Sequence, residues 1–168
     1  MLTRLTIAAM AVCMMIVLPE ISTAQDSADA SDFEPTRFGV GFQSTFPAYG
    51  LSGMMDVNDE ISVQAIVGFF GALNTFAGRG LYKFQDEDFW HLYGFGMVGV
   101  WTYSIGSFSE TVPGFGLGAG ISYDWRAFNE DLPPIYWNLE LGLGFVNFDE
   151  VNYNFSTFLF GVGVHYRF

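Results

Sequence analysis

The last eleven residues of the chain alternate strictly between two kinds of side chain. Side chains in a β-strand point to opposite faces with a period of two, so residues 158–168 put six large apolar side chains on one face. These are Phe158, Phe160, Val162, Val164, Tyr166 and Phe168. The opposite face carries glycines, one leucine, His165 and Arg167. This segment therefore predicts a strand with an apolar environment on one side and a crowded, polar one on the other.

The first 24 residues have the features of a secretory signal peptide. Arg4 precedes an apolar run over residues 7–18, Pro19 ends it, and Ser22, Thr23 and Ala24 supply small residues at the expected cleavage site. The run is too short to span a bilayer as a helix. We expect cleavage after Ala24. The only cysteine lies in this segment, so the mature chain has no disulfide or thiol chemistry.

The remainder, about 144 residues long, is predicted to be one domain. Residues 25–36 are acidic and polar, and we expect a disordered leader; a docking tail for a cationic partner is the alternative to a solvated segment. No second apolar run is long enough for a membrane helix, so strands must make any membrane crossing. A net charge of -12 excludes nucleic-acid binding through a basic surface.

From residue 37 onward, alternating runs are separated by turn residues. This pattern predicts an all-β fold, an eight-stranded antiparallel transmembrane β-barrel over residues 37–168. We place a long loop at residues 104–113 and turns at 85–88 and 127–134. Glycines of the run 89–103 fall in both phases, which leaves its side-chain phase undetermined and suggests a bulge. The predicted strands are 37–45, 49–57, 60–70, 74–84, 89–103, 114–126, 135–147 and 155–168.

Every basic residue after the signal peptide falls on the small, polar face of its strand. An interior of eight strands is just wide enough for side chains, and charges inside it must be paired. We expect Glu140 to pair with Arg79 or Arg126. The two interpretations are a filled polar core and an ion-conducting gate. The predicted lumen network comprises Arg37, Arg79, Lys83, Asp124, Arg126, Glu140, His165 and Arg167, with Gln43, Gln64 and Asn138 beside them.

Taken together, the signal peptide, strand pattern and aromatic C-terminal strand resemble the small outer-membrane barrels of the OmpA and OmpX type. The resemblance implies a cell-envelope protein of the outer membrane of a Gram-negative bacterium. Implied partners are outer-membrane lipids, lipopolysaccharide and the barrel assembly machinery, which would recognise Val164, Tyr166 and Phe168. We expect a monomer with short outer loops and with its acidic turns on the periplasmic rim. Aromatic residues near strand ends, including Trp101 and Tyr136, are predicted to form interfacial girdles.

A catalytic site is not evident in the sequence. Lipid A deacylases of this superfamily carry a His-x-Ser motif, whereas neither His91 nor His165 has a serine at short spacing. No metal-ligand spacing occurs. We therefore predict a non-enzymatic protein without metal or cofactor and with a structural role. A porin-like channel for small or hydrophobic solutes is the alternative, and a lipid-acting hydrolase is a remote third.

Overall fold

The computed structural model of the chain describes residues 38–148, 153–154 and 157–168. Within these ranges the regular structure is almost entirely β, and one short 3-10 helix, η1 (Trp125–Ala127), follows the sixth strand. The strands are β1 (Phe38–Thr45), β2 (Ala48–Asp56), β3 (Ile61–Phe70), β4 (Leu73–Glu87), β5 (Trp90–Ile105), β6 (Phe108–Asp124), β7 (Ile135–Phe148), β8 (Tyr153–Asn154) and β9 (Thr157–Arg167).

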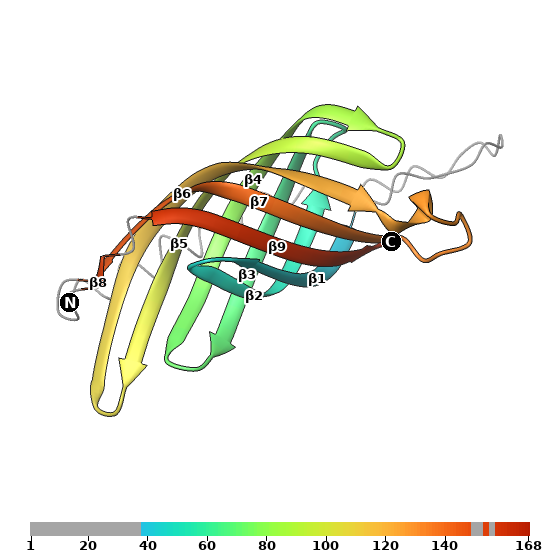
Figure 1. Ribbon diagram of the computed structural model, residues 1–168. Coiled ribbons are helices and arrows are strands. Elements are labelled where there is room, and N and C mark those ends of the chain that lie inside the picture. Colours follow the sequence, from blue (N-terminus) through green and yellow to red (C-terminus); the bar gives the residue numbers. More distant parts are fainter. Residues whose placement is uncertain (1–37, 149–152, 155–156) are drawn as a thin grey trace, which may run out of the picture. The chain divides into compact units, whose positions relative to one another are not determined.

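The strands close into an antiparallel barrel (Figure 1). Each of β1 to β5 pairs with the strand that follows it in the chain. β6 then pairs with β7, β7 with β9, and β9 with β1, which closes the ring. The short β8 pairs with the end of β7 beyond the segment that β9 covers, so β8 and β9 follow one another along the same neighbour. The predicted eight-stranded antiparallel barrel is confirmed. The eight main strands thus form a closed ring without the two free edges of an open sheet.

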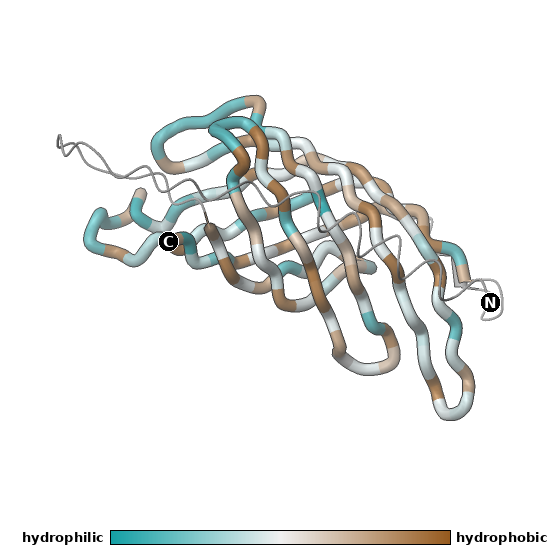
Figure 2. The backbone as a smooth tube through the Cα atoms, turned by 180° about the vertical axis from the view of Figure 1, so that it is seen from behind, coloured by the Kyte–Doolittle hydropathy of each residue, from teal (hydrophilic) through white to brown (hydrophobic). Residues whose placement is uncertain are grey.

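Alternation along the strands separates an apolar outer face from the interior. On β1 and β9, for example, Phe42 and Phe160 point outward while Gln43 and His165 are buried. Figure 2 shows this alternation along the tube. Hydrophilic residues are concentrated in the turns at the end where the C-terminus lies. Other exposed apolar side chains are Leu51, Phe76, Val98, Phe115, Leu117, Leu139, Leu141, Leu143, Phe145, Phe158, Val162 and Val164.

The hairpin between β5 and β6 corrects one sequence prediction. The loop expected at residues 104–113 is strand almost throughout, and the chain reverses at Gly106, whose φ of 61° suits glycine. Hydroxyl groups pair across the hairpin: Ser104 Oγ lies 3.0 Å from Ser109 Oγ. The serines that were predicted to lie in a loop instead form hydrogen bonds with one another across the two strands.

The bulge expected in the fifth strand lies in β4 instead. Pairing of β4 with β5 shifts between Lys83 and Gln85, so Phe84 is the extra residue. Alternation in β5 is unbroken, and its odd-numbered residues from 91 to 101 face the interior. The turn predicted at residues 85–88 is shorter, because β4 continues to Glu87.

Inward-facing glycines leave room for backbone and large side chains. A Cβ atom on Gly118 would lie 2.4 Å from the Leu141 carbonyl oxygen and 2.7 Å from the Phe95 ring. By contrast, a Cβ on Gly80, which faces outward from β4, would meet nothing within 4 Å. The interior is therefore closely filled, and only some of the glycines are required by that packing.

Candidate functional site

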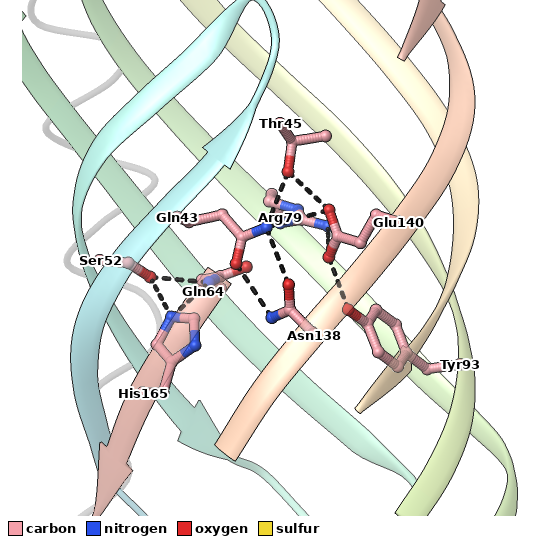
Figure 3. A network of polar contacts seen from close by, with 9 residues as sticks. All are labelled: Gln43, Thr45, Ser52, Gln64, Arg79, Tyr93, Asn138, Glu140 and His165. Carbon is pink, nitrogen blue, oxygen red and sulfur yellow. Dashed lines mark hydrogen bonds and ion pairs between the residues drawn. The ribbon is translucent and has the colours of Figure 1, made fainter. Parts of the chain in front are cut away.

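Glu140 on β7 is the centre of a buried polar network inside the barrel (Figure 3). Its Oε1 accepts hydrogen bonds from Arg79 Nη2 at 2.7 Å and from the Tyr93 hydroxyl at 2.6 Å. Its Oε2 accepts from the Thr45 hydroxyl at 2.5 Å and from Gln43 Nε2 at 3.2 Å. Glu140 is 1% exposed. Four donors therefore replace the water that a buried carboxylate loses.

Arg79 on β4 is the ion-pair partner of Glu140. Its guanidinium carbon also lies 4.1 Å from the centre of the Phe95 ring, within the range of a cation–π contact. Two of its nitrogens, Nε and Nη1, have no hydrogen-bond partner among the described residues. Because both charges are removed from water, loss of either partner would leave an uncompensated buried charge.

A layer of amides and a histidine continues the network toward the end of the barrel that holds the C-terminus. Gln43 and Asn138 exchange two hydrogen bonds, of 3.2 and 3.0 Å. The Gln64 amide nitrogen lies 2.7 Å from Ser52 Oγ and 3.1 Å from His165 Nε2. The Gln64 amide oxygen has no partner among the described residues. This layer ties β1, β2, β3, β7 and β9 together across the interior.

A serine does lie beside a histidine in space, although none does in sequence. His165 Nε2 is 3.0 Å from Ser52 Oγ, 113 residues away. Both residues are buried, and the Gln64 amide nitrogen also lies within hydrogen-bond distance of His165 Nε2. Among the described residues no carboxylate bonds the His165 ring. The pair therefore forms part of a packed polar layer, without the orienting acid and the accessible nucleophile of a hydrolytic triad.

Two cations share one carboxylate nearer the barrel end. Asp56 lies 3.1 Å from Arg167 Nη1 and 3.7 Å from Lys83 Nζ, and it accepts a hydrogen bond from the Ser62 hydroxyl. The Arg167 guanidinium also lies 4.7 Å from the Tyr136 ring centre. These contacts join β2, β4, β7 and β9.

Arg126 does not reach the central carboxylate. It lies in η1, where its Nε donates to the Asp124 carboxylate at 2.8 Å and its Nη2 donates to the Tyr136 hydroxyl at 2.9 Å. The hydrogen bonds to Asp124 raise the pKa of the Arg126 guanidinium above its ordinary value. Of the two arginines considered from the sequence, Arg79 is therefore the one paired with Glu140, and Arg126 closes the end of the barrel.

The other half of the interior is apolar, which corrects the expectation of a polar lumen throughout. Trp101 is fully buried, and its indole N–H donates to the Pro47 carbonyl at 3.0 Å. It lies inside the barrel and not in an interfacial girdle, and Tyr136 likewise lines the interior. The apolar cluster consists of Ala48, Ile66, Ala77, Leu81, Tyr93, Phe95, Met97, Trp101, Val112, Val146, Phe148 and Leu159.

The remaining predicted site residues divide into two groups. Arg37 lies outside the described residues. Val164, Tyr166 and Phe168, proposed from the resemblance as an assembly signal, are exposed on the outer face of β9 and the residue after it. Their exposure is a fact of the fold, and their role in assembly stays a prediction.

A vestibule opens among the charged residues at this end of the barrel. It has a volume of about 150 Å³, and its lining includes Asp56, Lys83, Asp86, Glu87, Asp88, Phe89, Trp90, His91, Tyr136 and Arg167. A second cavity, of about 10 Å³, shares His91, Tyr136 and Arg167 with it and reaches Gln64, Tyr93 and His165. The second cavity is just large enough for one water molecule.

Sequence reasoning missed the β5 residues Tyr93, Phe95, Met97 and Trp101 as lumen residues, and it missed Thr45 and Asp56 as partners of the buried charges. The glycines on both faces of β5 hid its phase. Large apolar residues also occur at even positions, among them Leu92, Val98 and Val100, so alternation alone does not show which face of β5 points inward.

In the described part of the chain, no helix has the length and apolarity needed to cross a membrane. Nor do the described residues bring three or more His, Cys, Asp or Glu side chains together in a way that would hold a metal ion.

A closed barrel with a packed interior and an outer face rich in Phe, Leu and Val belongs to the class of eight-stranded transmembrane β-barrels, because only lipid gives such a face an apolar environment. No family model matches the chain, and no curated protein matches it. Among solved structures it is similar to Ail, the attachment invasion locus protein of Yersinia pestis, with 14% identity over 79% of this chain and 94% of that one and a TM-score of 0.33.

Proposed function

We propose that this chain is a non-enzymatic barrel of the Gram-negative outer membrane, with a structural role in the envelope and a lumen that does not conduct. Residues 1–24 would be removed during export and residues 25–36 would form a leader. Outer-membrane lipids and lipopolysaccharide would cover the apolar face, and the barrel assembly machinery would insert it.

One observation carries the proposal: two successive layers fill the interior. The Glu140 network occupies the middle of the barrel, and most of the apolar cluster, around Trp101, lies beyond it; Leu81 and Tyr93 are on the vestibule side. An ion crossing the barrel would have to separate the buried Arg79–Glu140 pair and then pass side chains that offer it no hydrogen bonds. Each step costs several kcal/mol.

A channel for small solutes is the second candidate, and two neighbouring cavities that share His91, Tyr136 and Arg167 favour it. They lead from the mouth as far as Tyr93, whose hydroxyl bonds Glu140. In this alternative the polar network would rearrange to extend the path.

Conductance of purified, refolded protein in planar bilayers separates the two. We expect no conductance steps from the natural sequence. Trp101→Ala with Met97→Ala, which removes the centre of the apolar cluster, should produce steps if the fold persists. Steps from the natural sequence would contradict the structural proposal and support the channel.

The location is tested separately by fractionation. The protein should be found in the outer membrane, and its electrophoretic mobility in detergent should change on boiling, because a folded membrane barrel resists detergent until heated. Recovery from the soluble periplasm without a mobility change would contradict the proposal.

A further inference from the structure

The β-bulge in β4 turns an acidic side chain toward the inside of the barrel. Even-numbered residues of β4 up to Phe84 point outward, so unbroken alternation would point Asp86 outward too. The extra residue at Phe84 reverses the phase: Asp86 pairs with the inward-facing His91. Its carboxylate lies 3.9 Å from Lys83 Nζ and lines the vestibule. Bulges that redirect a side chain in this way are over-represented next to functional sites.

The inner wall of the vestibule presents two cationic side chains, Lys83 and Arg167, whose hydrogen-bonding capacity the fold uses only in part. Lys83 Nζ lies 3.7 and 3.9 Å from its two carboxylates, beyond hydrogen-bond distance, although the side chain is 9% exposed. Arg167 is 6% exposed and its Nε has no partner among the described residues. A buried donor such as Arg167 Nε normally has an acceptor.

The mouth of the same vestibule is acidic. Asp86 is 56% exposed in its side chain, and Glu87 and Asp88 follow it at the turn into β5. Four carboxylates and two cations line the cavity, which gives a net charge of -2 from four negative and two positive groups. A simple anion would be repelled at the mouth, and a simple cation would supply no acceptor to Arg167 Nε.

We propose that the vestibule binds a small zwitterion whose anionic phosphate or carboxylate enters first. Lys83 and Arg167 hold the anionic end, and Asp86 with its acidic neighbours holds the ammonium end. A volume of about 150 Å³ is about fifteen times that of the neighbouring one-water cavity of about 10 Å³, and it accommodates a molecule of the size of phosphoethanolamine without acyl chains. Such a group exists both as a free metabolite and as a lipid headgroup.

Lys83 is the only lysine of the chain, so isotope labelling of lysine gives a single reporter inside the site. Full-length mature protein is refolded in non-ionic detergent, and the Lys83 side-chain resonance is followed by NMR during titration with O-phosphoethanolamine. We expect a saturable shift. A second arm adds phosphatidylethanolamine to the micelles: a shift there without one from the free compound identifies a lipid headgroup as the source, and a shift from the free compound identifies the soluble one.

Separate titrations with ethanolamine, inorganic phosphate and calcium test the zwitterion requirement. Each should bind at least about tenfold more weakly, because each lacks one of the two charges. Asp86→Asn should weaken phosphoethanolamine binding about fivefold, as expected for loss of one partly exposed charge contact. Asp59→Asn, in the turn after β2 and outside the cavity lining, is the matched control and should have no effect.

Three results would overturn the proposal: no saturable shift with either phosphoethanolamine or its lipid, equal binding of phosphate or calcium alone, or equal effects of Asp86→Asn and Asp59→Asn. A boiling-dependent mobility change measured for each variant shows that it is folded. The proposal does not rest on the structural role proposed above.

Discussion

The indole N–H of Trp101 donates a hydrogen bond to the carbonyl oxygen of Pro47, and both residues are fully buried. Pro47 lies in the turn between β1 and β2, and Trp101 lies on β5, so the contact crosses the interior of the barrel. The Thr75 hydroxyl donates to the same oxygen at 3.3 Å. The turn of the β1–β2 hairpin is thereby anchored to the opposite wall and closes one end of the lumen.

Replacement of Trp101 should therefore cost both packing and one hydrogen bond. Trp101→Ala should lower the free energy of unfolding by about 3–5 kcal/mol, the usual cost of removing a large buried aromatic side chain. Trp101→Phe keeps much of the ring and loses the N–H donor, so its cost should be smaller by at least about 1 kcal/mol. Urea unfolding in lipid vesicles measures both. Equal costs would contradict the importance of the indole volume.

The Arg79–Glu140 pair should show strong coupling in a double-mutant cycle. Glu140→Gln or Arg79→Met alone leaves a buried charge unpaired and should cost about 3–5 kcal/mol. The double variant removes both charges and should cost clearly less than the sum. Asp124→Asn is the control, because its partner Arg126 is one-fifth exposed and can be solvated, so its cost should be smaller. Additive costs would show that the pair is not buried together.

Glycines on the two faces should respond in opposite ways to valine. Gly118→Val places a side chain against the Leu141 carbonyl and the Phe95 ring and should abolish folding. Gly80→Val points into open space on the outer face and should leave stability unchanged or raise it by up to about 1 kcal/mol, since glycine weakens a strand. The boiling-dependent mobility change and urea midpoints report the difference.

Arginine at two exposed apolar positions, one on the outer face and one at a hairpin tip, tests whether lipid covers the outer face. Leu141 and Ile105 are 66% and 56% exposed, so in water Arg at either position should change stability by less than about 0.5 kcal/mol. In a bilayer, Leu141→Arg should cost about 2–4 kcal/mol, whereas Ile105→Arg, at the tip of the β5–β6 hairpin, should cost at most about 1 kcal/mol. Equal effects in vesicles would contradict the membrane-spanning orientation.

The regular part of this fold could be predicted from the sequence because lipid and lumen impose opposite requirements on alternate residues. Strands such as β7 and β9 carry large apolar residues in one phase and Glu140, His165 and Arg167 in the other, so barrel class and phase follow directly. The central partner of Glu140 could be narrowed to two arginines. The choice between them depends on stagger around the barrel, which alternation does not determine.

Other features could not be predicted, because they depend on which strand lies opposite. The β5 lumen residues Phe95 and Met97 look lipid-facing until they are placed in the interior. The hydroxyl pairs Thr102–Thr111 and Ser104–Ser109 in the extended part of β5 and β6 can be recognised only once the register of the hairpin is known. His165 meets Ser52 only because β2 and β9 flank the same strand, β1.

Closure of the barrel depends on the pairing of β1 with β9, which runs from Gly39 opposite Arg167 to Thr45 opposite Gly161. The paired residues of β1 and β9 are separated by almost the whole folded sequence. Closing so long a loop has a large entropic cost, so this pairing should form slowly. Until β9 pairs, the backbone N–H and C=O groups on one edge of β1 and one edge of β7 are unpaired, and a strand of another chain could bind there. Removal of β9 would expose both edges at once, and the resulting fragment should aggregate in place of forming a smaller barrel.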